Sequence, residues 1–218
     1  MMATPTIHRR RIGRFLGLAA LAVATSACGD VVRDGRSPVF LVIDSLRAAP
    51  TGGFGANTFQ SNLFSDVQVL ITDPAPCTTA SPCPTTFSDS GQVTLRIALK
   101  DIGTAAAPTA PTSNNEVTIT RVRVAYRRTD GRNVPGIDVP YGFDVGSTAT
   151  IPAGGTATVG FELVRHVAKA ESPLVQLISN PNVIAAIADV TFYGKDRVGN
   201  EITVTGSISI EFGNFGDG

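Results

Sequence analysis

Two acidic side chains are the residues of this chain that could carry out hydrolysis. Asp138 and Asp144 flank the segment Val139 to Phe143, and pairs of carboxyl groups about 5 to 9 Å apart cleave glycosidic bonds. A separation of six residues along a strand is about 20 Å, so these two acids could meet only across a bend. The alternative is that both are solvated residues at strand ends, and we expect this alternative. A carbohydrate-active or other hydrolytic enzyme that uses loop carboxylates is therefore the second functional hypothesis.

A cluster of arginines lies within residues 121–132 and is the main concentration of basic side chains after residue 28. Guanidinium groups bind phosphate and carboxylate groups through two parallel hydrogen bonds. Together on one sheet face, these arginines could bind anionic polysaccharide or lipid headgroups. The alternative is that these arginines lie on a solvated strand face and form ion pairs with nearby acids, and we expect this alternative. If the chain has an anion-binding site, we predict it at Arg121, Arg123, Arg127 and Arg128, with Arg132 close by.

Other catalytic and metal-binding patterns are weak or missing in the sequence. His166 is the only histidine after residue 27, and no Gly-x-Ser-x-Gly elbow supplies a nucleophile for it. Asp196, Asn200 and Glu201 could offer oxygen ligands to calcium, but they lack the dense acidic spacing of an EF-hand loop, so we expect them to stabilise a turn. No phosphate-binding or dinucleotide-binding loop is present either. We therefore expect no catalytic residue, no metal and no cofactor.

The first 29 residues follow the order that is typical of an export signal. Arg9, Arg10, Arg11 and Arg14 precede an apolar run from Phe15 to Ala24, and small residues follow. Basic residues stay on the cytoplasmic side while the apolar run enters the bilayer. The run is shorter than the roughly 20 residues that span a hydrocarbon core, so a retained transmembrane helix is not expected. The sequence predicts export.

The end of this segment, Ser26-Ala27-Cys28-Gly29, resembles the lipobox of bacterial lipoproteins. The resemblance implies that Cys28 is the lipid-modified first residue of the mature protein. It also implies that Gly29 is compatible with sorting to an outer membrane. Thr25 departs from the Leu, Val or Ala that the family favours at that position, and ordinary cleavage after Ala27 is the alternative. We predict a signal peptide over 1–27, a tether over 28–37, and anchoring to a bacterial membrane, with the outer membrane or cell surface favoured.

The two remaining cysteines fit an oxidising compartment. Cys77 and Cys83 have the spacing of a small disulfide loop. Closing so short a loop contributes only about 2 kcal/mol on the chain-entropy model. A metal site on these thiols is not expected, because no histidine or third cysteine lies nearby in the sequence.

Charge and length limit the function further. After residue 27 the chain has 14 Lys and Arg against 18 Asp and Glu, a formal charge of −4. This balance argues against broad nucleic-acid binding, which requires excess basic charge to neutralise phosphates. The remaining 191 residues are enough for one large domain with a substantial core.

The secondary-structure elements that position the candidate acids and arginines are predicted to be mostly strands. Apolar and polar residues alternate strictly over Val93–Leu99 and Ile202–Phe212, which predicts strands with one buried face. Between Glu116 and Arg128 the phase of the alternation changes, so we expect a bulge near Thr120 to Val122, with Arg121 and Arg123 sharing a solvent face. Shorter strands are predicted at Val67–Ile71, Tyr141–Val145, Val159–Leu163, Val190–Tyr193 and Val39–Ile43, the last apolar throughout and expected to be covered on both faces.

One helix is predicted, and the remaining segments are loops. Ser172-Pro173 supplies an N-cap and a first helical proline, and Asn180-Pro181 ends a helix of about two turns. Long connections rich in Gly, Ala, Thr, Pro and Ser are expected to be mobile surface loops at 48–62, 73–90 and 103–115.

Seven to nine short strands with a single small helix favour an all-β antiparallel sandwich over residues 38–213, followed by a tail over 214–218. The segment Gly194-Lys195-Asp196 and Val198 to Val204 resembles the terminal hairpin of bacterial immunoglobulin-like and fibronectin-like domains. This resemblance covers roughly the last 25 residues and implies an immunoglobulin-like sandwich used as a spacer or binding module. The first functional hypothesis is thus a non-enzymatic, lipid-anchored envelope protein. Its expected partners are the membrane, through the lipid, and envelope polysaccharide or protein.

Overall fold

The computed structural model of the protein describes residues 36–53 and 55–216. The predicted signal peptide, Cys28 and most of the predicted tether lie outside these residues. The described part of the chain consists mainly of strands, which confirms the predicted all-β class. The strands are β1 (Val39–Ala49), β2 (Asn62–Asp66), β3 (Val69–Ile71), β4 (Cys83–Thr85), β5 (Asp89–Leu99), β6 (Gly103–Thr104), β7 (Ala107–Pro108), β8 (Val117–Arg127), β9 (Phe143–Ile151), β10 (Thr156–Val164), β11 (Ile184–Asp196) and β12 (Glu201–Gly213).

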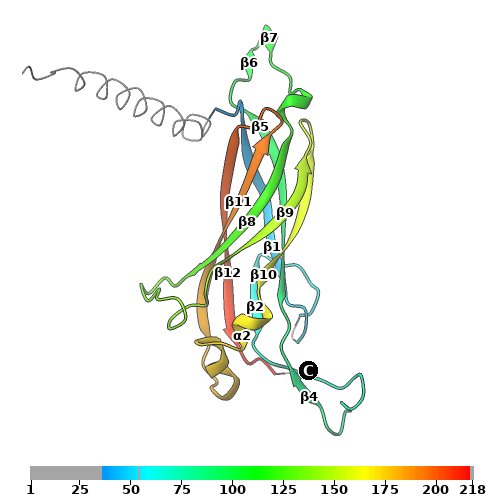
Figure 1. The fold of residues 1–218 in the computed structure, drawn as a ribbon, viewed down its shortest axis with the longest axis vertical. Coiled ribbons are helices and arrows are strands. Elements are labelled where there is room, and N and C mark those ends of the chain that lie inside the picture. The colour runs from blue at the N-terminus through cyan, green and yellow to red at the C-terminus, as the bar shows by residue number, and fades with distance from the viewer. Residues whose placement is uncertain (1–35, 54, 217–218) are drawn as a thin grey trace, which may run out of the picture.

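Two sheets built from the long strands form the body of the molecule (Figure 1). One sheet has the order β1-β5-β10, and the other has the order β2-β12-β11-β8-β9. Their strand pairs are antiparallel except for β12 and β2, which run parallel. The expectation of an antiparallel arrangement throughout is therefore wrong at this edge. A parallel neighbour needs a long crossover and not a hairpin, and here β2 is reached through the connection 50–61.

Both sheets contribute side chains to one core. The ring of Phe161 on β10 packs edge-to-face on Phe192 of β11, with ring centroids 5.5 Å apart. The hydroxyl of Tyr126 on β8 donates a hydrogen bond of 2.6 Å to the carbonyl oxygen of Leu163 on β10. Burial raises the pKa of this tyrosine, so the hydroxyl remains protonated and can donate. These contacts fix the two sheets against each other.

Two glycines make room for large apolar side chains, Gly206 between the two sheets and Gly91 within the three-stranded sheet. A Cβ at Gly206 of β12 would lie 2.7 Å from Cδ1 of Ile43 on β1. A Cβ at Gly91 of β5 would collide with the ring of Phe161. Glycine at these positions leaves room for large apolar side chains, because interiors are packed to crystal-like density.

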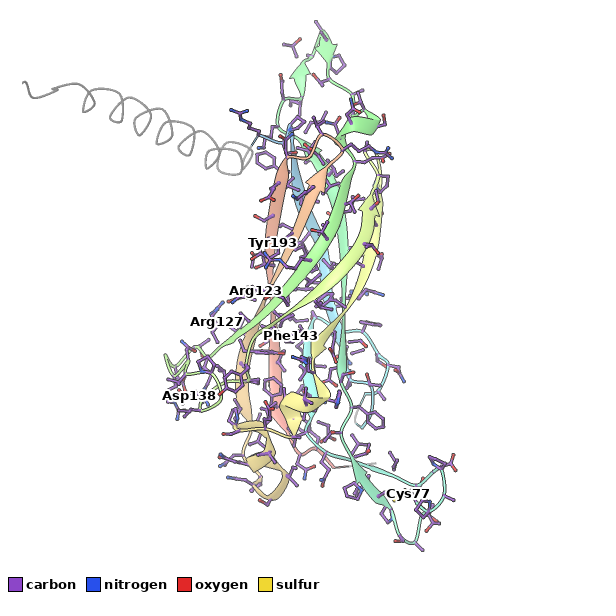
Figure 2. The ribbon with its side chains drawn as sticks, viewed as in Figure 1. Cys77, Arg123, Arg127, Asp138, Phe143 and Tyr193 are labelled. Carbon is purple, nitrogen blue, oxygen red and sulfur yellow. A yellow bond between two sulfur atoms is a disulfide. The ribbon has the colours of Figure 1, made fainter. Side chains whose placement is uncertain are left out.

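The main local predictions are confirmed. The pairing of β8 with β9 shifts register between Ile119 and Arg121, which is where the bulge was expected. The last hairpin pairs β11 with β12 without a break from Ile184 and Phe212 to Lys195 and Glu201. Cys77, in the long β3–β4 connection (Figure 2), forms a disulfide with Cys83 at the start of β4, and their Cα atoms are 5.3 Å apart.

The prediction for β1 is wrong, and the helix predicted after Ser172 is present at its predicted place but differs in type and cap. The apolar run indicated burial on both faces of β1, but Phe40 is 54% exposed, so its face is not covered at this residue. The predicted helix after Ser172 is a 3-10 helix, η2 (Leu174–Ser179), whose N-cap is Pro173 without a capping hydrogen bond. The hydroxyl of Ser172 instead accepts a hydrogen bond from the side chain of Gln176.

Two further short helices were not predicted. They are α2 (His166–Lys169), directly after β10, and η1 (Ser113–Asn115), before β8. His166 is the first residue of this one-turn helix α2. In the described residues, no helix combines the length and apolar character needed to cross a membrane.

Candidate binding face

The bulge in β8 decides which arginines share a surface. Ile119 and Val122 both point into the core and are completely buried. The two residues between them, Thr120 and Arg121, are therefore both exposed, and ordinary alternation then brings Arg123 and Arg127 to the same side. Tyr193, Arg123 and Arg127 follow one another in this order down the sheet in Figure 2. We call this surface the arginine face and define it by Arg121, Arg123, Arg127, Asp144, Asp189 and Tyr193.

Asp144 on β9 lies between two arginines of β8. Its Oδ1 is 3.1 Å from Nη1 of Arg121, and its Oδ2 is 3.3 Å from Nη1 of Arg123. All three side chains are between 37% and 53% exposed. One carboxylate thus serves two guanidinium groups that remain open to solvent.

Tyr193 on β11 lies beneath Arg121. The two residues face each other across the β8–β11 pair, and the guanidinium carbon is 3.8 Å from the centre of the tyrosine ring. A guanidinium group stacked on an aromatic face is attracted to the ring and is held in one orientation. Arg121 is therefore positioned by an acid on one strand and an aromatic ring on another.

Asp189 on β11 organises the other end of the arginine face. Its Oδ2 accepts a hydrogen bond of 2.7 Å from Nε of Arg127, and its Oδ1 accepts one of 2.6 Å from the hydroxyl of Ser207 on β12. Partial burial opposes ionisation of this acid, but the hydrogen bonds from Arg127 and Ser207 outweigh it, so the pKa of Asp189 is lowered. Next to it, the hydroxyls of Thr191 and Thr205 are 2.9 Å apart. The surface of β11 and β12 is thus rich in hydroxyl groups.

Two of the predicted arginines do not belong to this face. Arg128 and Arg132 lie in the β8–β9 loop, and both pair with Asp130, at 2.9 and 2.7 Å. Hydrogen bonds from Arg132 lower the pKa of Asp130. The structure therefore brings together Arg121, Arg123 and Arg127 but directs Arg128 and Arg132 into a separate loop cluster.

The two acids considered for hydrolysis occupy different surroundings. Asp138 lies in the β8–β9 loop, where its Oδ2 accepts a hydrogen bond of 3.0 Å from the backbone N–H of Val134. Asp144 is held by Arg121 and Arg123. Both carboxylates thus have structural partners. In the described part of the chain, no contact joins the two acids, so nothing in their geometry favours the hydrolytic alternative.

The acidic turn between β11 and β12 holds its own backbone. Oδ1 of Asp196 accepts hydrogen bonds from the backbone N–H of Val198 and Asn200, at 3.0 and 2.8 Å. Oδ2 accepts one from the side-chain amide of Asn200. Glu201 lies 3.1 Å from the ammonium group of Lys195. Within residues 36–53 and 55–216, no group of three His, Cys, Asp or Glu residues is arranged to hold a metal ion.

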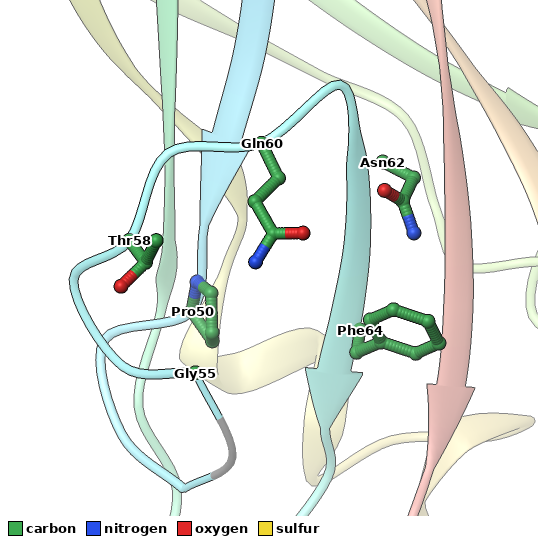
Figure 3. Close-up of a pocket in the computed structure, with 6 residues that line it drawn as sticks. All are labelled: Pro50, Gly55, Thr58, Gln60, Asn62 and Phe64. Carbon is green, nitrogen blue, oxygen red and sulfur yellow. The ribbon is translucent and has the colours of Figure 1, made fainter.

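The hollows of the described surface do not suggest a small-molecule site. The hollow shown in Figure 3, between the β1–β2 connection and β2, has a volume of about 10 Å³, enough for no more than a water molecule. A larger hollow of about 410 Å³ lies over β5 and β10 between Phe59 and Phe161, but it is shallow and open. Neither hollow is lined by residues of the arginine face.

Sequence reasoning found the arginines of β8 but not their partners. Asp189 and Tyr193 lie 62 and 72 residues away from Arg127 and Arg121 along the chain, so only the pairing of β8 with β11 brings them together. The outward positions of β11 in the alternating pattern could have indicated Tyr193. Nothing in the sequence specified which strand would lie beside β8.

Comparison with known proteins does not assign this chain to a family. The chain matches no protein-family model, and no curated protein is significantly similar to it.

Proposed function

We propose that this protein is a non-enzymatic binding module of the bacterial envelope, anchored by a lipid on Cys28, whose arginine face binds anionic polysaccharide. The observation that carries the proposal is the position of Arg121. Its guanidinium group is oriented by Asp144 and stacked on Tyr193, and Arg123 shares the same carboxylate. The arginine pair is therefore prearranged and still exposed.

The charge of the arginine face supports an acidic ligand. Three guanidinium groups are balanced by only the two carboxylates of Asp144 and Asp189. This leaves one excess positive charge on a domain whose overall formal charge is negative. A carboxylate or sulfate group of a ligand could bind the N–H groups of Arg121 and Arg123 other than those that face Asp144, because each guanidinium group has five N–H donors.

The shape of the face supports a polymer. It extends over three neighbouring long strands, β9, β8 and β11, of the five-stranded sheet. Hydroxyl groups of Thr203, Thr205, Ser207 and Ser209 follow one another along β12 at alternate positions, which provides donors and acceptors for sugar hydroxyls. An aromatic ring and hydroxyl groups beside a basic pair suit a chain of acidic sugars better than a compact ligand.

The anchor is supported by the sequence of residues 9–29, which lies outside the described structure. The proposed immunoglobulin-like relationship also rests on a resemblance in the sequence, that of the segment 194–204. The two packed sheets and the terminal β11–β12 hairpin support that relationship, while the parallel β12–β2 pair departs from an all-antiparallel sandwich.

The binding proposal can be tested with polygalacturonate as the anionic probe. We expect the Arg121→Gln/Arg123→Gln variant to bind the probe about tenfold more weakly, equivalent to about 1.4 kcal/mol. Added salt should weaken binding by the unaltered protein, because exposed charges are screened. The matched control is Arg96→Gln, since Arg96 is 46% exposed and pairs with Asp44 on the other sheet. Equal affinity of all three proteins, or no affinity at all, would refute the polysaccharide proposal.

The anchor needs a separate measurement. Mass spectrometry of the N-terminal peptide from a membrane extract should find an acylated Cys28, and a Cys28→Ser variant should lose membrane association. An unmodified peptide that begins after Ala27 would show that the ordinary secretory alternative is correct.

A further inference from the structure

We infer that the end of the domain at which the tether joins β1 rests on the lipid surface, with the side chains of Ile102, Val198 and Phe40 in contact with the membrane interface. This inference depends on the proposed lipid at Cys28. It goes further because it assigns the domain an orientation and a second membrane contact.

The start of the described chain is fixed to this end of the domain. Ser37 is almost completely buried, and its hydroxyl donates a hydrogen bond to the carboxylate of Asp196, at the end of β11. The backbone N–H of Lys100, directly after β5, donates a hydrogen bond of 2.9 Å to the carbonyl oxygen of Pro38. The tether therefore joins the domain beside the β11–β12 turn and the β5–β8 connection.

This end exposes large apolar side chains. Ile102 is 73% exposed, Val198 in the β11–β12 turn is 69% exposed, and Phe40 is 54% exposed. Residues 102–115 contain no charged side chain, and all of them except Asn115 are exposed. This uncharged segment includes the β6–β7 hairpin, which projects beyond the sheets at the top of Figure 1. Apolar loop tips beside a membrane anchor can bury their surface in the headgroup region.

The charges at this end do not oppose an anionic lipid surface. Arg197 is paired with Glu116 at 2.6 Å, and Lys195 is paired with Glu201 at 3.1 Å. The other charges at this end balance, with Arg36 and Lys100 against Asp101 and the ionised Asp196. The ammonium group of Lys100 lies over the ring of Phe40, 5.1 Å from its centre. A basic group above an exposed aromatic ring is suited to the boundary between headgroups and acyl chains.

The length of the tether keeps this end close to the membrane. Seven residues, 29–35, separate Cys28 from Arg36, so the two Cα atoms can be at most about 28 Å apart. A tether this short gives the lipid surface a high effective concentration at the end of the domain. A contact too weak to hold a free protein on a membrane can therefore form once the lipid is inserted.

The opposite end also has exposed apolar residues, but they lie in a different setting. Val134, Ile137 and Tyr141 belong to the β8–β9 loop, which also carries the charged residues of the loop cluster. Strand β8 has 11 residues and separates the two ends by about 35 Å. This loop is the matched control for the inference, because it is equally exposed and far from the tether.

The test uses the absence of tryptophan from the chain. Ile102→Trp and Ile137→Trp each introduce one fluorophore at a position that is 73% or 69% exposed. Each acylated mature protein, which begins at Cys28, is reconstituted into vesicles of phosphatidylethanolamine and phosphatidylglycerol. We expect the tryptophan at position 102 to show blue-shifted emission, quenching by brominated lipid and protection from iodide. The tryptophan at position 137 should remain accessible to iodide and insensitive to brominated lipid.

The outcomes separate this inference from the proposed function. If mass spectrometry shows an acylated Cys28 but both tryptophans respond alike, the orientation is wrong and the lipid anchor stands. If position 102 is protected from iodide but not quenched by brominated lipid, another protein surface covers this end and lipid contact is refuted. If Cys28 carries no acyl group, both the anchor and this inference are refuted.

Discussion

The ammonium group of Lys169 lies 2.9 Å from Oδ2 of Asp89, and the two side chains are only 2% and 1% exposed. The hydroxyl of Ser65 donates a hydrogen bond of 2.6 Å to the same oxygen. The three residues come from α2, β5 and β2, so this buried cluster joins the two sheets and the short helix. Desolvation raises the pKa of Asp89, while Lys169 and Ser65 act in the opposite direction. The ion pair therefore offsets a large cost of burial.

Removal of the buried cation should destabilise the domain strongly. We expect Lys169→Met to lower the free energy of unfolding by about 3 to 5 kcal/mol near neutral pH, because it leaves a buried carboxylate without its partner. A raised pKa means that the folded state binds the proton more tightly than the unfolded chain, so the loss should grow as the pH rises. Urea unfolding between pH 4 and 8 measures this dependence.

The control for this experiment is the double variant Asp89→Asn/Lys169→Met. Without the buried charge, it should regain part of the stability lost in the single variant and show a smaller dependence on pH. A double variant as unstable as the sum of both single variants would show that the two side chains act independently.

The β11–β12 turn should make the domain sensitive to acid. Burial opposes ionisation of Asp196, but hydrogen bonds from Asn200, Ser37 and Val198 outweigh it, so the pKa of Asp196 is lowered below its ordinary value of 3.8. Stability from the ionised carboxylate is present above that value and is lost as the pH falls through the folded-state pKa. We expect Asp196→Asn to cost about 1 to 3 kcal/mol at pH 7 and much less at pH 3. Denaturant titrations at the two pH values, with the exposed loop variant Asp73→Asn as control, decide the point.

The packing of Phe161 can be tested at a neighbouring glycine. A methyl group at Gly91 would push the ring of Phe161 toward Phe192 in the other sheet, and overpacking of this kind costs about 1 to 3 kcal/mol. Gly160→Ala is the control, because a Cβ at that position meets nothing within 4 Å. Thermal unfolding should show a lower Tm for Gly91→Ala alone, and equal Tm values would contradict the packing argument.

The disulfide should matter little for the whole domain. Cys77 and Cys83 are six residues apart, so the bond removes little chain entropy, and Cys77→Ala/Cys83→Ala should cost no more than about 2 kcal/mol. Circular dichroism of the variant should retain the β spectrum. Loss of the folded state would show that the β3–β4 connection supports the core more than its loop length implies.

Local patterns in the sequence determined the strands and their faces. Alternation of apolar and polar residues has the same period as a strand, so it indicated β5, β8 and β12 and even the bulge before Arg121. The same pattern was misleading at β1, where Phe40 belongs to an apolar run but lies on an uncovered face. Periodicity reports which residues can be buried, but not whether another element covers them.

The sequence alone was enough to predict export, the disulfide pair and the strand pattern. The structure confirms the disulfide and the strands. Only the tertiary structure decided that Tyr193 supports Arg121, that Arg128 turns away into a loop, and that Lys169 meets Asp89. Arg121 and Tyr193 are 72 positions apart in the chain, and Asp89 and Lys169 are 80 positions apart. Strand order and sheet packing decide which distant residues become neighbours. Both depend on the free energy of the whole core and not on any local segment.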